Sequence, residues 1–178
     1  MNYESITYPD VNNGVGCRVT LWVSGCSHHC PGCHNQCTWD FKSGQPFTDE
    51  VKDKICELLE LPYIDGLTLS GGDPMDSAEE LIPFVEEVTD RFNGKNKTIW
   101  LYTGYTLEQI MDDPVKLRLL HSGIHVVVDG PYIEAKRNIT LPFRGSTNQR
   151  IWTVRMDGSY REIKDIEFDN EQNLHTRH

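Results

Sequence analysis

The sequence VTLWVSGCSHHCPGCHNQC, residues 19–37, joins a run of strand-forming residues to a loop that contains four cysteines. Residues 19–23 are β-branched, aliphatic or aromatic and favour an extended strand. The four cysteines lie within twelve residues, at Cys26, Cys30, Cys33 and Cys37. Thiolates this close in sequence can surround one inorganic centre if the backbone turns tightly, and the glycines and proline beside them favour such turns. The stretch therefore predicts a strand that ends at a metal site.

Further strand and helix patterns alternate after the cysteine loop. Strands are predicted at residues 67–69, 98–102 and 124–128. Between them, apolar residues recur on one helical face, at Val51, Ile55, Leu58 and Leu59 and again at Leu81, Val85, Val88 and Phe92. Strands that alternate with helices form right-handed βαβ units. The predicted fold class is α/β, as an open partial βα barrel or a twisted sheet with mainly parallel strands.

Capping patterns indicate where several helices begin. Ser77 and Thr106 are each followed three residues later by Glu or Gln, which is the spacing of a capping box. Asp113 precedes a proline that fits the first position of a helix. Pro83 either kinks the second helix or marks its true start after an irregular turn at residues 77–82.

Length, charge and composition exclude several classes of protein. A chain of 178 residues is one domain and is too short for a complete eight-fold βα barrel of ~250 residues. A formal charge of −10 argues against nucleic acid or an anionic membrane as the main partner. The N-terminus and the short apolar runs predict neither a signal peptide nor a membrane span. Six cysteines without an export signal point to a reducing compartment, so we expect a cytoplasmic protein.

The number of cysteines that bind decides what the loop can do. If all four bind, the site is closed and fits structural zinc or an electron-carrying 4Fe-4S cluster. If only Cys26, Cys30 and Cys33 bind a cluster, one iron keeps an open position for a substrate. An open position would make the loop a site of chemistry.

The spacing CxxxCxxC directly after a first strand resembles the signature of the radical S-adenosylmethionine (SAM) enzymes. The resemblance implies that Cys26, Cys30 and Cys33 are the metal ligands and catalytic residues. They would hold a 4Fe-4S cluster whose fourth iron SAM chelates through its amino and carboxylate groups. An electron from the cluster would then cleave SAM to methionine and a 5′-deoxyadenosyl radical, so the cofactor carries the difficult chemistry.

Two further segments are assigned to SAM by the same resemblance. Gly71-Gly72-Asp73-Pro74 resembles the superfamily's Gly-Gly-Glu/Asp-Pro motif and implies that Gly71, Gly72 and Asp73 bind the methionine amino group. Glycines permit that close approach, and a carboxylate can pair with an ammonium. Around the third cysteine, Gly32, Cys33 and His34 are assigned to the adenine end of the cofactor, with His34 where a tyrosine is usual.

The cysteine loop and a segment in the C-terminal part of the chain both resemble one particular family. Residues 30–35, CPGCHN, are similar to the Cys-Pro-Gly-Cys-Tyr-Asn of the anaerobic ribonucleoside-triphosphate reductase-activating proteins, and residues 144–150, RGSTNQR, match that family's C-terminal signature. This implies a radical SAM domain at 1–155 and a hydrophilic tail at 156–178, which we expect to be disordered.

The family resemblance implies a concrete activity. The adenosyl radical would abstract a hydrogen atom from a glycine α-carbon on the large subunit of the class III reductase and leave a stable glycyl radical. The target is then a peptide loop, which an incomplete barrel could admit from its open side. A flavodoxin-like protein is the implied reductant of the cluster.

Other cysteines and histidines are expected outside the site. The family resemblance leaves Cys37 outside the ligand set, while Cys17 and Cys56 are expected to be structural, since free cysteine is commonly a small buried hydrophobe. His28 and His29 are expected to be solvated loop side chains, because three thiolates already account for the loop.

Several alternatives stay open at this point. Asp129 either faces the site or holds a turn with Gly130, and residues 144–150 line the groove, bind the partner peptide or brace the final strand. For the whole protein, the alternatives to the activating enzyme are another small radical SAM enzyme and a non-catalytic four-cysteine iron–sulfur or zinc protein.

Overall fold

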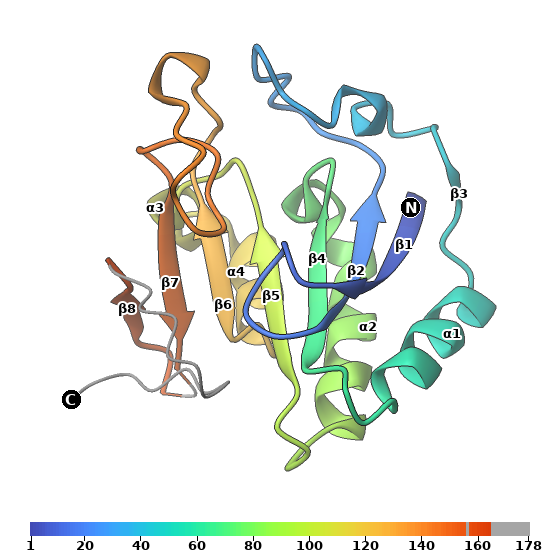
Figure 1. Ribbon diagram of the computed structural model, residues 1–178. Coiled ribbons are helices and arrows are strands. Elements are labelled where there is room, and N and C mark those ends of the chain that lie inside the picture. The colour runs from blue at the N-terminus through green and yellow to red at the C-terminus, as the bar shows by residue number, and fades with distance from the viewer. Residues whose placement is uncertain (156, 165–178) are drawn as a thin grey trace.

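The computed structural model describes residues 1–155 and 157–164. They form a mixed α/β fold around one eight-stranded sheet, with the strand order β3-β1-β2-β4-β5-β6-β7-β8 (Figure 1). The strands are β1 (Asn2–Asp10), β2 (Arg18–Val23), β3 (Gln45–Pro46), β4 (Gly66–Gly71), β5 (Thr98–Tyr102), β6 (Val126–Asp129), β7 (Arg150–Val154) and β8 (Tyr160–Glu162). The helices are α1 (Asp49–Leu59), α2 (Ala78–Arg91), α3 (Leu107–Met111) and α4 (Pro114–His121), with short 3-10 turns at Gln36–Thr38, Pro74–Ser77 and Glu134–Lys136.

The sheet is parallel in its centre and antiparallel on both sides. Three parallel pairings join β2, β4, β5 and β6, whereas four antiparallel pairings add β1, β3, β7 and β8. The predicted α/β class is confirmed, but the prediction of mainly parallel strands is wrong. Parallel neighbours need a crossover connection, and the connections at 11–17 and 130–149 bring the chain back antiparallel. The strand order runs open from β3 to β8.

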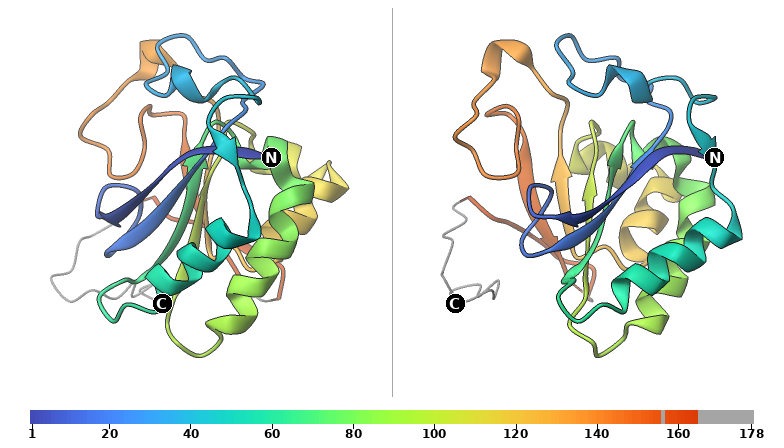
Figure 2. Two further views of the ribbon diagram at one scale, coloured as in Figure 1. Left: turned by 90° about the vertical axis from the view of Figure 1, so that its right-hand side faces the viewer. Right: turned by 45° about the vertical axis from the view of Figure 1, so that its right-hand side comes forward.

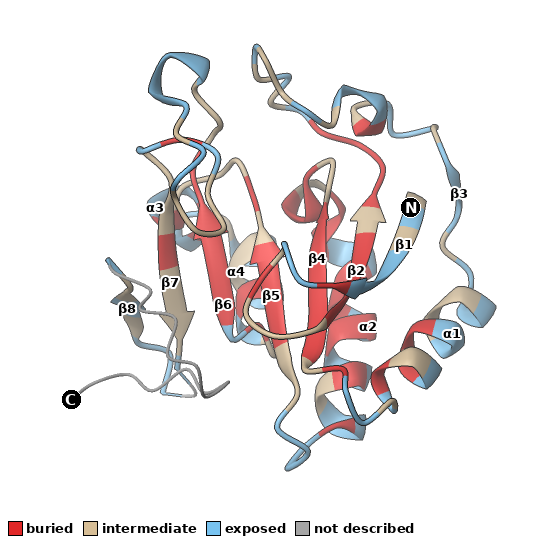
Figure 3. Ribbon diagram, viewed as in Figure 1, coloured by how far each residue is buried: buried red, intermediate tan, exposed pale blue. Residues whose placement is uncertain are grey.

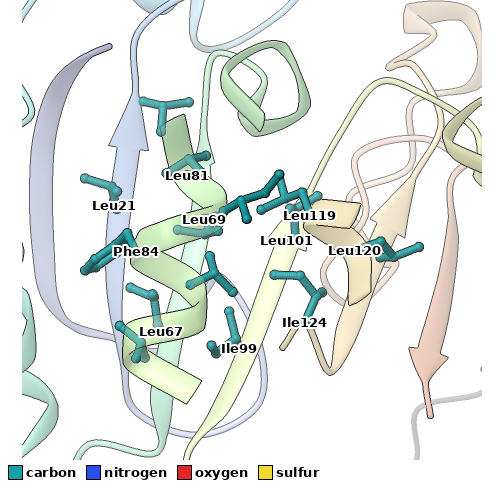
Figure 4. Close-up of a cluster of buried hydrophobic side chains, with 14 of the residues drawn as sticks. Leu21, Leu67, Leu69, Leu81, Phe84, Ile99, Leu101, Leu119, Leu120 and Ile124 are labelled. Carbon is teal, nitrogen blue, oxygen red and sulfur yellow. The ribbon is translucent and has the colours of Figure 1, made fainter. Parts of the chain in front are cut away.

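The main hydrophobic core lies between the sheet and the helices. Alternate residues of the parallel strands, such as Leu67, Leu69 and Leu101, are fully buried on this face. They pack against the apolar faces of α1, α2 and α4, to which Phe84 and Leu119 belong (Figure 4). Figure 2 shows these helices gathered on one side of the sheet. The helical periodicity in the sequence therefore identifies the helix faces that close the core.

In the part of the chain that the structure describes, loops cover the other face of the sheet. A second buried cluster there contains Trp100, Val126, Val128 and Ile151, and the partly buried Val15 and Phe143 pack against it. The central strands are accordingly buried along most of their length (Figure 3). Apolar residues at nearly every position of β6 fit a strand that is covered on both sides.

A buried arginine ties the first parallel strands together on this second face. Arg18 is fully buried, donates from Nε to Thr68 Oγ1 at 2.6 Å, and donates from one guanidinium nitrogen to the carbonyls of Leu67 and Thr98 at 2.6 and 2.8 Å. Its guanidinium carbon lies 5.6 Å from the centre of the Trp100 ring. Burial lowers the pKa of Arg18 to about 10, so the side chain is charged at neutral pH and its donors are satisfied by these contacts.

The predicted helix starts are partly confirmed. Thr106 and Gln109 form a complete capping box, and the Asp113 side chain accepts hydrogen bonds at the start of α4. Ser77 makes no side-chain cap bond, because the 3-10 turn before α2 is capped by Asp73 instead. Pro83 lies inside α2, which begins at Ala78, so the alternative start after residue 82 is wrong.

The end of the chain is described only in part. β8 falls within the range expected to be a hydrophilic tail, and it pairs with β7. Residue 156 and residues 165–178 lie outside the described residues. The expectation that these residues are disordered therefore stays a prediction. In the described ranges, no helix is long and apolar enough to cross a membrane.

Candidate active site

The cysteine loop begins where β2 ends, at the carboxyl edge of the parallel strands (Figure 1). Two backbone hydrogen bonds close its base: the amide of Gly25 donates to the Thr38 carbonyl at 2.7 Å, and that of Cys26 to the Trp39 carbonyl at 3.1 Å. Substrate sites of open parallel sheets lie at this edge. The position predicted for the metal site from the sequence is therefore where such a fold can bind ligands.

The thiols of the loop differ in their exposure. Cys26 is buried, Cys30 and Cys33 are half-buried, and Cys37 is exposed on a short 3-10 turn; all four are free. Burial raises the pKa of Cys26 to about 11 and also raises the pKa of Cys30. Such thiols are protonated at neutral pH and would release protons when they bind a metal.

The donor set of the loop fits an iron–sulfur cluster better than a single metal ion. Soft thiolates are the usual ligands of iron–sulfur clusters. Within the described ranges, no three His, Cys, Asp or Glu side chains are grouped as they would be around one ion. A four-iron cluster is larger than an ion, so the sulfurs that hold it stand further apart. Cys26, Cys30 and Cys33 supply three free thiols on one short loop, which is the donor type that such a cluster takes.

The glycines at the end of β4 allow two backbones to come together. Gly71 has a φ of +109°, and a Cβ there would lie 2.5 Å from the backbone of Val23. A Cβ on Gly72 would lie 2.1 Å from the carbonyl oxygen of Gly25. The glycine pair therefore has a structural reason to be present, since it seats the end of β4 against β2 and the start of the cysteine loop.

Asp73 joins the ends of β4 and β5. Its carboxylate is almost fully buried and accepts hydrogen bonds from Thr103 Oγ1 at 3.0 Å, the Gly104 amide at 2.8 Å and the Met75 amide at 2.9 Å. Its own backbone amide donates to the Gly25 carbonyl at 2.7 Å. Asp73 thus lies where three chain segments meet, next to the cysteine loop.

His28 completes this junction from the cysteine loop. Its Nε2 lies 2.9 Å from Asp73 Oδ2, and its ring lies edge-on to the Tyr105 ring at 4.4 Å. The contact with Asp73 raises the pKa of His28 above its usual range. The expectation of a solvated side chain is therefore wrong for His28, because a buried carboxylate attracts the imidazole. His29 is exposed, as expected, and lies edge-on to Trp39.

A second carboxylate that the sequence analysis did not single out also holds the loop. Asp76 accepts hydrogen bonds from the backbone amide of Ser27 at 2.7 Å and from the Tyr105 hydroxyl at 2.6 Å. Burial and this hydrogen bond raise the pKa of Tyr105 to about 12. The sequence signal was weak, since Asp76 is two residues past the recognised motif and its partners are 49 and 29 residues away.

The loop between β6 and β7 reaches the cysteine loop from the other side. Gly32 has a φ of +75°, and a Cβ there would lie 2.8 Å from the Glu134 side chain. The exposed His34 lies 6.1 Å from the Tyr132 ring, measured between ring centres. Gly32 and His34, both assigned to the adenine end of the cofactor, therefore face residues 132–134.

Asp129 and the end of the 144–150 motif have structural roles. Asp129 is fully buried, accepts from the Leu107 amide at 2.7 Å and pairs with Arg150, which also binds Glu108. Asn148 donates to the Pro131 carbonyl at 2.7 Å, and Gln149 accepts from the Gly145 amide at 2.8 Å. These contacts brace the start of α3 and the two ends of the 130–149 loop. Asp129 thus braces α3 and β7 through its side chain, which is a different structural role from the turn with Gly130 that the sequence suggested.

The combination of a thiol-rich loop after β2 with a Gly-Gly-Asp turn after the neighbouring parallel strand defines an iron–sulfur protein of the radical SAM type. A protein-family model described as a 4Fe-4S single cluster domain matches residues 12–152. The chain belongs to the family of anaerobic ribonucleoside-triphosphate reductase-activating proteins, as its similarity to individual members shows.

The chain matches three of these relatives over nearly the whole length of each relative. The activating protein of Enterobacteria phage T4 is 42% identical over 157 residues, or 86% of this chain and 94% of the phage protein. That of Vibrio cholerae is 44% identical over 155 residues, or 85% of this chain and 97% of its own. That of Escherichia coli K12 is 38% identical over 159 residues, or 87% of this chain and 100% of its own.

Proposed function

We propose that this protein activates an anaerobic ribonucleoside-triphosphate reductase by forming a glycyl radical on the reductase large subunit. The observation that carries the proposal is the junction at Asp73, where the cysteine loop, the Gly-Gly turn of β4 and the end of β5 meet at one edge of the sheet. Relatives of this chain that match over most of its length are named as reductase-activating proteins.

In this proposal Cys26, Cys30 and Cys33 hold a 4Fe-4S cluster. When bound, the cluster and SAM supply the chemistry: one electron cleaves SAM to methionine and a 5′-deoxyadenosyl radical, which takes a hydrogen atom from a glycine α-carbon. The half-buried positions of Cys30 and Cys33 leave one side of the loop accessible, whereas Cys26 anchors it in the protein. Cys37 is exposed and has no part in the ligand set.

The residues assigned to SAM surround the same junction. Asp73 would attract the SAM ammonium, with Gly71 and Gly72 presenting backbone beside it. The ammonium would compete with His28 for the Asp73 carboxylate, since His28 already lies 2.9 Å from it. Gly32 and His34 would face the adenine, beside the loop that carries Tyr132.

The open architecture supports a peptide as the target. Among the described strands, β3 and β8 are the two edges of the sheet, and described loops cover the face of the sheet away from the helices. An open partial barrel of this kind gives a loop of the reductase large subunit a route to the cluster. A flavodoxin-like protein would deliver the electron.

The decisive experiment follows the hydrogen atom. The protein is reconstituted anaerobically, reduced with flavodoxin or dithionite, and mixed with SAM and a reductase large subunit labelled with α-deuterated glycine. We expect a glycyl radical in the electron paramagnetic resonance spectrum and deuterium in the 5′-deoxyadenosine. Nucleoside without deuterium, and no protein radical, would contradict the proposal. A reduced cluster that is indifferent to SAM would instead favour the electron carrier.

A further inference from the structure

An aromatic surface lies against one side of the cysteine loop. The half-buried Trp39 and the exposed His29 meet edge-on, with their ring centres 4.8 Å apart. Phe41 is 50% exposed, and its ring lies on the backbone of the loop, because a Cβ on Gly25 would be 2.2 Å from it. His29, Trp39 and Phe41 are here called the aromatic patch. None of the three is assigned to the cluster or to SAM.

The aromatic patch is joined to proposed cluster ligands by short contacts. The Cys26 amide donates to the Trp39 carbonyl at 3.1 Å, and Phe41 covers the residue that precedes Cys26. His29 directly precedes Cys30 in the sequence. Because electron transfer slows steeply with distance, a donor seated on this patch would have a short path to the cluster.

The aromatic patch lies on the side of the cysteine loop that SAM does not need. Two neighbouring histidines mark the two sides, since His28 contacts Asp73 whereas His29 contacts Trp39. Residues 131–149 stand on the β7 side of the loop, and the chain that leaves the loop runs toward β3 on the other side (Figure 1). SAM and the target glycine must lie next to each other, so both occupy the Asp73 side. An electron donor that leaves them in place has to approach from the aromatic patch.

The sequence around the patch is poor in negative charge. Residues 11–48 contain Asp40 as their only acidic residue, in a chain that has 27 acidic residues and a formal charge of −10. Lys42 follows Phe41, is exposed, and forms no ion pair with any residue in the described ranges. The net charge of the chain repels a partner with an acidic surface, and this stretch contributes little to that repulsion. Aromatic residues with few acids around them are typical of the core of a protein interface.

From these observations we infer that the aromatic patch is the docking surface for a one-electron flavoprotein of the flavodoxin type. The inference rests on the proposed function, which needs an electron at the cluster, and it assigns the place where the carrier binds this chain. Such a carrier presents the flat, apolar edge of its flavin within a rim of acidic side chains, which suits an aromatic patch beside Lys42. Electron-transfer complexes commonly bury less than about 1,200 Å², so a small patch suffices.

The transfer itself moves one electron. The fully reduced flavin is oxidised by one electron, the cluster is reduced by one electron, and no bond forms or breaks. The patch therefore only has to hold the flavin edge close to the cysteine loop for the time of the transfer.

The test compares a protein donor with a small donor that needs no docking surface. The cluster-loaded protein in its oxidised form is mixed anaerobically with fully reduced flavodoxin or with reduced methyl viologen, and the absorbance of the donor is followed by stopped flow. Phe41→Ser should slow reduction by flavodoxin about 10-fold. Lys42→Glu should slow it about 3-fold at low salt, with the effect shrinking as ionic strength rises. Neither variant should slow reduction by methyl viologen.

Matched controls carry the same substitutions elsewhere. Tyr63→Ser removes an aromatic ring that is 54% exposed in the connection before β4, at the opposite edge of the sheet. Lys54→Glu reverses an exposed charge on α1. Both controls should match the unmodified protein with either donor. Lys42→Glu alters no packed side chain, so it keeps the test decisive if Phe41→Ser fails to fold.

Binding is measured separately from electron transfer. Calorimetric titration of oxidised flavodoxin into the oxidised protein should show about 10-fold weaker binding for Phe41→Ser than for Tyr63→Ser. Weaker binding of the reductase large subunit, with flavodoxin binding unchanged, would assign the patch to the reductase and overturn the inference. Slower reduction by both donors would also overturn it, because the patch would then support the cluster itself.

The inference and the proposed function fail in different ways. If flavodoxin and methyl viologen both reduce the unmodified protein but no glycyl radical forms, the proposed function fails and the docking surface is still read from the reduction rates. If the radical forms and both patch variants equal their controls, only the docking surface fails.

Discussion

Nε2 of His28 lies 2.9 Å from Oδ2 of Asp73, so a side chain of the cysteine loop touches the carboxylate at the end of β4. The His28 imidazole packs against Gly104, where a Cβ would lie only 2.5 Å from the ring. The Thr103 hydroxyl donates to the same Asp73 oxygen that His28 contacts. The cysteine loop is thereby coupled to the strand ends independently of the cluster.

Asp73→Asn should weaken both the fold and SAM binding. The amide keeps one acceptor oxygen where the carboxylate has two, and it loses the negative charge that would attract an ammonium. We expect the free energy of unfolding to fall by about 1–3 kcal/mol and SAM affinity to fall at least ~10-fold. Urea unfolding and SAM binding by equilibrium dialysis measure the two effects.

The matched variant is His28→Ala, which removes the competing contact and leaves the carboxylate. It should bind SAM at least as tightly as the unmodified protein. An Asp73→Asn protein with unchanged SAM affinity would exclude Asp73 from the cofactor site.

Serine at Cys26, Cys30 or Cys33 should each abolish the cluster, whereas Cys37→Ser should keep it. The three predicted ligands lie in the loop at partly or fully buried positions, while Cys37 is exposed. Iron and sulfide content after anaerobic reconstitution distinguish these outcomes. Loss of iron from Cys37→Ser would support the four-cysteine alternative and contradict an open iron position.

Arg150→Ala should destabilise the protein through Asp129. Asp129 is fully buried and pairs with Arg150, so removing the cation leaves an uncompensated charge inside the protein. We expect a loss of about 3 kcal/mol in the free energy of unfolding. Glu108→Gln is the control, because Glu108 is the exposed partner of the same arginine and should cost less than about 1 kcal/mol. Equal effects of the two variants in urea unfolding would contradict this account.

Acid should destabilise the junction of β1 and β2 through Asp10. Burial alone would raise the pKa of Asp10, but hydrogen bonds from the Asn12 amide, Asn13 and Thr20 outweigh burial and lower it below 3.8. Because the folded pKa is below the unfolded one, this stabilisation is present above about pH 4 and is lost as pH falls through the folded pKa.

Asp10→Asn should remove that part of the acid sensitivity. Urea unfolding of the apoprotein from pH 7 to pH 3 measures it without interference from acid loss of the cluster. The difference in unfolding free energy between the unmodified protein and Asp10→Asn should shrink as pH falls below about 4. A difference that is independent of pH would show that Asp10 titrates normally.

The local features of this protein can be predicted from its sequence. The strand that precedes the cysteine loop, the other central strands, the capping box at Thr106 and the start of α4 at Asp113 are all present in the structure. Each depends on residues within a few positions of one another, where periodicity and capping preferences act directly. The cysteine spacing indicated the radical SAM superfamily for the same reason, because it lies within one short loop, whereas residues 30–35 and 144–150 indicated the family.

The tertiary structure alone decided how distant segments meet. The antiparallel strands β1, β7 and β8 flank the parallel centre because their connections contain no crossover helix. No local sequence pattern predicted this arrangement. Asp73 contacts Thr103 and His28, which are 30 and 45 residues away in the sequence. Arg150 binds Asp129, whereas the Nε of Arg144 has no hydrogen-bond partner in the part of the chain that the structure describes. Such roles depend on which strand ends become neighbours, and strand order and register arise only when the whole sheet assembles.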